Sequence, residues 1–156
     1  MKNKMDEILA YLIEVDKDTG EPFKGYLSKI PNDLKFLQSF VDFGGNQGLI
    51  QVVNIRGIDI ICHDEGKLRY FPYSRVVLDD NNSILDVFAG NLICVRADYK
   101  TGEFISIQKE DIPIINHYIK PAVILPIDDI VIKLENDWLQ KRKIEDMKGK
   151  PYNEQD

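Results

Sequence analysis

Short apolar runs broken by turn residues dominate the chain up to residue 107 and predict β-strands. The run from Ile8 to Val15 is apolar on both faces, which is typical of a strand in the middle of a sheet. Glycine-bearing turns between the later runs favour antiparallel hairpins. Residues 83–89 fit either a strand or one helical turn. The other predicted strands span residues 23–28, 49–55, 58–62, 67–71, 92–97 and 103–107.

Helical spacing of apolar residues first occurs after the second predicted strand. Leu34, Leu37 and Val41 recur three and four residues apart, as they do on the buried face of a helix. Asn32 is the predicted N-cap of this helix. The glycine pair at 44–45 is predicted to end it, because glycine readily adopts the left-handed conformation of a C-cap.

Two more helices are predicted near the end of the chain. The first is predicted over residues 109–119. Its latest possible start is Asp111, because Pro113 is tolerated only near a helix start. The second spans residues 127–148 and presents one apolar seam, which either docks on the chain's own sheet or contacts a second copy in a homo-oligomer. The partner-contacting residues of this seam are Val131, Leu134 and Trp138.

These elements together predict an α+β fold. The expected core is a mainly antiparallel sheet of about five to seven strands with two packed helices and a C-terminal helix. We expect a single α+β domain over residues 1–126, the C-terminal helix appended at 127–148, and a flexible tail at 149–156.

The composition favours a compact protein that stays in the cytoplasm. The chain has 156 residues, of which 44% are hydrophobic, and a formal net charge of −6. Such an acidic chain lacks the basic face that a nucleic acid polymer requires. The sequence predicts neither a signal peptide nor a membrane span. We expect Cys62 and Cys94, which lie in apolar runs, to be reduced core thiols.

Residues 65–75 are the main candidate for binding chemistry. This stretch gathers two arginines, a lysine and three aromatic residues within an acidic chain. Arginine matches phosphate oxygens in pairs, and aromatic rings stack on a purine. The stretch therefore predicts a pocket for a small anionic, nucleotide-like ligand. The predicted ligand-binding residues are Arg69, Arg75, Tyr70, Tyr73, Lys67, Arg56 and Arg96.

The predicted strand at 67–71 would divide these side chains between two faces. Alternation places Lys67 and Arg69 on one face, and Pro72 ends the strand so that Arg75 belongs to a loop. The hypothesis requires Arg69 and Arg75 to face the same concavity. In the alternative, Tyr70 and Phe71 pack in the core while the arginines form surface ion pairs with Asp59, Asp64 or Asp86.

Metal-dependent and nucleophilic chemistry find little support. Cys62 and His63 are adjacent in a predicted strand, so their side chains point to opposite faces. The chain has two histidines and two cysteines, without the spacing of a zinc site. We expect no catalytic residue, no metal and no cofactor.

Several short motifs occur in a distinctive order along residues 8–119. The early strand is followed by Asn32-Asp33-Leu34 and then by Asp64-Glu65-Gly66-Lys67-Leu68. The later motifs are Pro72 with Arg75, the run Asp86-Val87-Phe88-Ala89-Gly90-Asn91-Leu92, Gly102-Glu103-Phe104-Ile105-Ser106-Ile107, and Glu110-Asp111-Ile112.

In this order of motifs the chain resembles a family of small domains of unknown function that is common in bacteriophages and mobile elements. Members usually carry a threonine-like cap where this chain has Gln108. The resemblance implies a phage-associated accessory protein of α+β fold in the host cytoplasm. Some small phage proteins of this kind counter host immunity by sequestering nucleotide-derived signals.

Three functions follow as hypotheses. The first is a phage-encoded anti-defence sponge, which binds an ADP-ribose-type or cyclic nucleotide signal without turnover. The second is a protein–protein inhibitor or adaptor of a host factor, acting through the acidic surface and the C-terminal helix. The third is a hydrolase of the nucleotide signal. The first is preferred, because no nucleophile–base pair is visible in the sequence.

Overall fold

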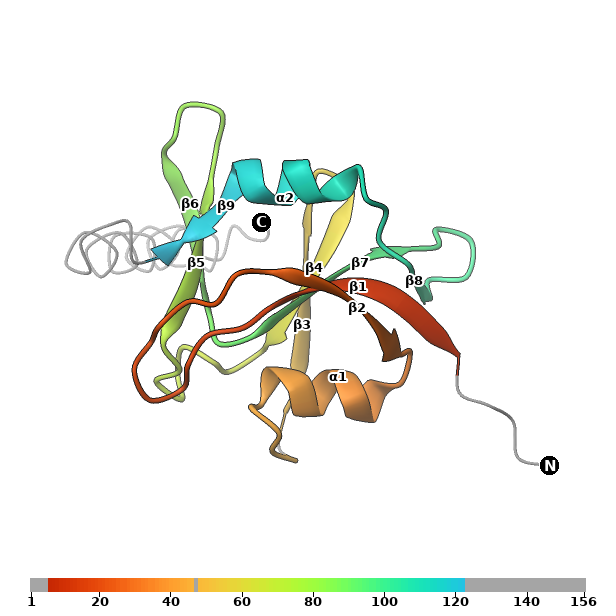
Figure 1. The fold of residues 1–156 in the computed structure, drawn as a ribbon, viewed down its shortest axis with the longest axis horizontal. Helices are drawn as coiled ribbons and strands as arrows, with labels where there is room; N and C mark the ends of the chain where they lie inside the picture. Colours follow the sequence, from red (N-terminus) through yellow and green to blue (C-terminus); the bar gives the residue numbers. More distant parts are fainter. Residues whose placement is uncertain (1–5, 47, 123–156) are drawn as a thin grey trace, which may run out of the picture. The chain divides into compact units, whose positions relative to one another are not determined.

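The computed structural model describes residues 6–46 and 48–122 (Figure 1). The chain divides into two compact units, residues 1–122 and 123–156, and the described residues belong to the first. The predicted C-terminal helix, with Val131, Leu134 and Trp138, lies outside the described residues. The described elements are β1 (Glu7–Ile13), β2 (Tyr26–Pro31), α1 (Leu34–Val41), β3 (Ile50–Ile55), β4 (Ile58–His63), β5 (Tyr73–Leu78), β6 (Ile84–Ala89), β7 (Leu92–Ala97), β8 (Phe104–Ile105), α2 (Asp111–Tyr118) and β9 (Ile119–Pro121).

The strands form two antiparallel sheets. The main sheet has six strands, in the order β2-β1-β7-β4-β3, with β8 paired to β7. The second sheet has three strands, in the order β6-β5-β9. The mainly antiparallel architecture with two helices agrees with the predicted class. The prediction of one sheet was wrong, because β5, β6 and β9 pair with one another and not with the main sheet.

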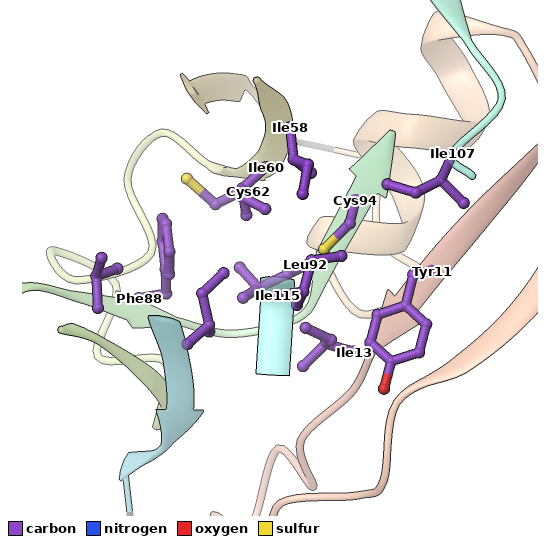
Figure 2. Close-up of a cluster of buried hydrophobic side chains, with 12 residues drawn as sticks. Tyr11, Ile13, Ile58, Ile60, Cys62, Phe88, Leu92, Cys94, Ile107 and Ile115 are labelled. Atoms are coloured by element: carbon purple, nitrogen blue, oxygen red, sulfur yellow. The ribbon is translucent and has the colours of Figure 1, made fainter. Parts of the chain in front are cut away.

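Hydrophobic clusters cover both faces of the main sheet. On one face, Ile61 and Ile93 pack with Leu37 and Val41 of α1. On the other face, side chains of β4 and β7 pack against the second sheet and α2, as Figure 2 shows for Cys94 and Ile115. Figure 1 accordingly shows α1 and α2 on opposite sides of the main sheet. Each fully buried aliphatic side chain contributes about 1.5–3 kcal/mol.

Helix α1 begins one residue later than the sequence predicts. Asp33 is the N-cap, and its carboxylate accepts a hydrogen bond from the Phe36 N–H at 3.3 Å. Asn32, the predicted cap, instead donates its side-chain amide to the Phe104 carbonyl at 3.0 Å. Phe43 and Gly44 follow the helix with φ values of 56° and 85°, so the left-handed turn predicted at its end is present.

The predicted strand at 67–71 is wrong. Residues 64–70 form turns that are closed by local backbone bonds, including Arg69 N–H to the Glu65 carbonyl at 2.9 Å and Phe71 N–H to the Gly66 carbonyl at 2.9 Å. The alternation of faces expected for Lys67 and Arg69 therefore does not occur. The next strand, β5, lies where the sequence predicts a loop that contains Arg75, and 83–89 contains strand β6.

Neither described helix is long and apolar enough to cross a membrane.

Candidate functional site

A pocket of about 260 Å³ opens between the main sheet and the second sheet. Strands β3 and β4 form one wall, β6 forms the opposite wall, and the turn of residues 64–70 borders it. Cys62 and Phe88, which are labelled in Figure 2, both line the pocket. The lining is mixed, and its apolar part comes from Val53, Leu68, Val87, Phe88 and Ala89.

The exposed polar groups of the pocket lie at its rim. Lys67 Nζ is 3.0 Å from Asp86 Oδ1, and the two side chains are 42% and 49% exposed. Asp64 and Gln51 also line the pocket. An ion pair this exposed contributes only about 0–1 kcal/mol, so the Lys67 ammonium can exchange Asp86 for another anion at little cost.

The Cys62 thiol lines the pocket from β4. Its Sγ lies 4.0 Å from Gln51 Oε1, to which the thiol donates. Burial raises the pKa of Cys62 to about 11, and the nearby Asp86 and Asp64 carboxylates also raise it, against the lowering effect of Lys67. The thiol is therefore protonated at neutral pH, and it is a weak nucleophile because the thiolate is the reactive form.

The two cysteines are expected to differ in their reaction with iodoacetamide. Cys62 borders an open pocket, whereas Cys94 is fully buried in the core and burial also raises its pKa. In native protein, Cys62 should be alkylated slowly and Cys94 only after unfolding. Peptide mass spectrometry of a labelling time course measures both rates. Equal rates for the two thiols in native protein would contradict this placement.

A buried ionic cluster anchors the turn that borders the pocket. Asp42 Oδ1, just after α1, accepts from Arg69 Nη1 at 2.8 Å and lies 3.2 Å from His63 Nε2. The Glu65 N–H donates to His63 Nδ1 at 2.9 Å. Since Nδ1 accepts, the neutral ring carries its proton on Nε2 and donates it to Asp42. The cluster thus joins α1, β4 and the turn through one carboxylate.

Aromatic packing completes the anchoring of the turn. The Phe71 ring meets the Phe43 and His63 rings edge-on, at centroid distances of 4.9 and 5.2 Å. The Arg69 guanidinium lies 5.2 Å from the Phe71 ring centroid. At Gly66 a Cβ atom would lie 3.1 Å from the Ala89 carbonyl oxygen, so the turn packs closely on β6. Lys67 and Leu68 are therefore held at the pocket by neighbours that pack against the sheet and helix α1.

A family model for "Domain of unknown function (DUF3846)" matches residues 10–121. The chain belongs to this family. The match spans β1 to β9 and includes every residue of the pocket and of the ionic cluster. No curated protein and no solved structure matches the chain.

The DUF3846 fold distributes the predicted ligand-binding residues over several places. Lys67 lines the pocket. Arg69 is bound to Asp42, as described above. Tyr70 is 93% exposed, and its φ of 58° is part of the turn. Tyr73 lies half-buried at the start of β5.

Two other predicted arginines form ion pairs that the sequence does not indicate. Arg56 Nη2 lies 3.0 Å from Asp80 Oδ2, and its guanidinium stacks on the Tyr118 ring at 4.6 Å. Arg96 binds both oxygens of Asp111, at 2.7 and 2.5 Å. The arginines therefore form ion pairs as the alternative interpretation expects, but with Asp42, Asp80 and Asp111 and not with Asp59, Asp64 or Asp86. Phe71 is buried as that interpretation expects, whereas Tyr70 is not.

Arg75 lies inside the protein. It is 6% exposed, and it donates to the backbone carbonyls of Ser74 and Phe23, both at 2.9 Å. Burial lowers the pKa of its guanidinium from the ordinary value. Because the Arg69 guanidinium contacts Asp42 and the Arg75 guanidinium contacts these carbonyls, the two arginines share no partner in the described structure.

Sequence reasoning missed most of the pocket. Gln51, Cys62 and Phe88 come from three strands, and no local motif marks them as neighbours. Asp42 carries no signal either, because a carboxylate at the end of a helix is usually exposed. Among the described residues, no group of three or more histidine, cysteine or acidic side chains is arranged to hold a metal ion.

Proposed function

We propose that this DUF3846 protein binds a small nucleotide-derived ligand in the pocket between β3, β4 and β6, and does so without turnover. The observation that carries the proposal is the pocket itself, which combines apolar walls with a lysine, an amide and two carboxylates at its rim. Apolar walls suit a base, the rim groups of Gln51 and Asp64 suit its polar edge, and Lys67 suits a phosphate.

The size of the pocket limits the ligand. A volume of about 260 Å³ is slightly below the ~300–1,000 Å³ that is typical of sites for drug-sized molecules. This favours one nucleoside with one phosphate as the enclosed group. In an ADP-ribose-type ligand, one nucleoside monophosphate half would enter while the remainder stays outside. A cyclic dinucleotide would be enclosed only in part.

The chemistry of the lining supports binding over catalysis. The Cys62 thiol is protonated at neutral pH, because its pKa is raised to about 11. Both ring nitrogens of His63 are already engaged, one by the Glu65 N–H and the other by Asp42. A general base needs a free lone pair within reach of a substrate, and His63 offers none to the pocket.

The phage setting rests on the resemblance described for the sequence. In that setting the protein would act in the host cytoplasm as an anti-defence sponge, lowering the free concentration of a nucleotide signal. Such a sponge needs a preformed site and stoichiometric amounts, but no reaction. The anchored turn of residues 64–70 supports a preformed site, since preorganisation reduces the cost of binding.

Isothermal titration with adenosine monophosphate, ADP-ribose and cyclic di-adenosine monophosphate tests this function. ADP-ribose and adenosine monophosphate should bind, and Lys67→Met should weaken their binding about tenfold or more, because a charge-assisted hydrogen bond contributes about 1.5–3 kcal/mol. Lys29→Met is the matched control. Lys29 is an exposed lysine on β2, away from the pocket lining, and its loss should leave affinity unchanged.

Two results would count against the proposal. Absence of heat with all three ligands rejects nucleotide binding, and equal effects of Lys67→Met and Lys29→Met reject this pocket as the site. Turnover is measured separately. The bound compound is released by heating and identified by mass spectrometry, and a hydrolysed product would reject sequestration.

A further inference from the structure

Within residues 6–46 and 48–122, strand β3 is an edge of the main sheet with no strand on its outer side. It stands at the end of the strand order and pairs, among the described strands, with β4 alone. Its sequence, Ile-Gln-Val-Val-Asn-Ile, contains no charged residue, although the chain has a net charge of −6. Val52 at its centre is 42% exposed, and Leu49 just before it is 51% exposed. An apolar, β-branched edge without charge is a template for pairing with another strand.

The other edge strands of the two sheets carry features that oppose such pairing. Strand β2 contains Lys29 and ends at Pro31. Strand β9 contains Lys120 and Pro121. Strand β6 contains Asp86 and lies beside register shifts in its pairing with β5. Charges, prolines and bulges are the usual means by which edges avoid association. Strand β3 has none of them.

The backbone of β3 shows which residues would face a partner. The Asp64 N–H donates to the Leu49 carbonyl at 2.7 Å, and Ile55 pairs with Ile58 across the two-residue turn at Arg56 and Gly57. Odd-numbered positions therefore bond to β4. The backbone groups of the even-numbered positions, Ile50, Val52 and Asn54, point away from β4 and are available to another strand.

We propose that β3 pairs antiparallel with β3 of a second copy, about a two-fold axis at Val52. This register brings the outward backbone groups of Val52 opposite those of the partner's Val52, and places Ile50 opposite the partner's Asn54. Every pair in it joins side chains of the same face, as a continuous sheet requires. An interface centred on an uncharged strand avoids the self-repulsion that a net charge of −6 imposes elsewhere.

The same pairing bears on the pocket. In this register Gln51 lies opposite the partner's Val53, and both positions line pockets. Each copy would therefore extend one wall of its partner's pocket at the rim. Dimer formation does not depend on the proposed ligand, because the contacts between the two copies are made by β3 alone.

Light scattering during size-exclusion chromatography of the full chain tests the dimer. Wild type should be dimeric and dissociate on dilution. Val52→Lys and Val52→Glu should each be monomeric, because each places two like charges face to face on the axis. An equimolar mixture of the two variants should restore the dimer, since opposite charges then meet. Leu85→Lys, on the exposed face of β6, is the matched control and should remain dimeric.

A cysteine cross-link tests the register. Opposite residues of a hydrogen-bonded antiparallel pair have Cα atoms about 5.5 Å apart, within the range of a disulfide. Val52→Cys should form a covalent dimer under mild oxidation, whereas Asn54→Cys, which faces the partner's Ile50, should not. A wild type that is monomeric throughout the dilution series overturns the proposal, as does a Val52→Lys variant that stays dimeric. Equal cross-linking at both positions overturns the register.

Discussion

Replacing Asp42 with alanine is expected to lower the free energy of unfolding by about 3–5 kcal/mol, which is the usual cost of removing one member of a buried ion pair. Asp42 is 7% exposed, and its carboxylate contacts both the Arg69 guanidinium and the His63 ring. Without it, the fully buried His63 ring loses its acceptor and the Arg69 guanidinium loses its counter-ion. The cost arises mainly from His63, whose side chain is 0% exposed, because the Arg69 guanidinium is 37% exposed and can be rehydrated in part.

Urea unfolding followed by circular dichroism measures this change. Asp86→Ala is the matched control, since it removes one carboxylate from an exposed pair with Lys67 and should cost about 0–1 kcal/mol. Asp42→Ala should also release the turn of residues 64–70, so hydrogen exchange of the Arg69 and Phe71 amides should accelerate. Equal stability of the two variants would show that the cluster contributes no more than a surface pair.

Replacing Arg96 with methionine is expected to cost a similar amount at neutral pH, about 3–5 kcal/mol. Asp111 is 1% exposed and opens α2, and it holds Arg96 through both oxygens. The Arg96 hydrogen bonds, together with the Gln108 N–H, hold the pKa of Asp111 below its ordinary 3.8 despite burial. Methionine preserves much of the aliphatic stem, so the lost stability reports the charge.

The way in which the stability difference changes with pH distinguishes an electrostatic contribution of the Arg96–Asp111 pair from a packing contribution of the Arg96 side chain. A carboxyl with a lowered folded-state pKa stabilises the protein above its ordinary value of 3.8, and that contribution is lost as the pH falls through the folded pKa. In Arg96→Met, burial without the guanidinium should raise the pKa of Asp111. The stability difference between wild type and variant should therefore shrink on acidification.

Urea titrations at neutral pH and at pH values below 3.8 check this expectation. Arg56→Met serves as the control, because Asp80 in its exposed pair is 67% accessible. A difference between wild type and Arg96→Met that stays constant with pH would contradict an electrostatic role for the pair.

Local patterns in the sequence predict those strands and helices whose formation is determined by residues close together in the chain. The strand at 92–97 is confirmed at both ends, because a continuous apolar run bounded by turns has few alternatives. Helix α1 is confirmed apart from its cap, because apolar residues three and four positions apart fit the buried face of a helix. The turn at 64–70 was mistaken for a strand, because its apolar residues suggest alternation while Gly66 and the left-handed Tyr70 permit local closure. Which strands share a sheet depends on pairing between distant segments, which periodicity does not record.

The candidate site was predictable only in part. Lys67 was identified from the local concentration of basic and aromatic residues, and it does line the pocket. The partners of the arginines could not be read from the sequence. Arg69 reaches Asp42 across 27 positions and Arg56 reaches Asp80 across 24. A chain with 26 acidic residues offers many candidate partners, and only the fold selects among them.

The pairing of β1 with β7 has a consequence for how the chain folds during synthesis. Tyr11 lies beside Cys94 in this pairing, and no strand between them in sequence takes the place of β7 next to β1. The hairpins β3–β4 and β5–β6 can close as they leave the ribosome, since their contacts are local. Strand β1 can close a hairpin with β2 early, but its other edge stays unpaired until β7 has emerged, so the nascent N-terminal segment needs protection from misassembly at that edge.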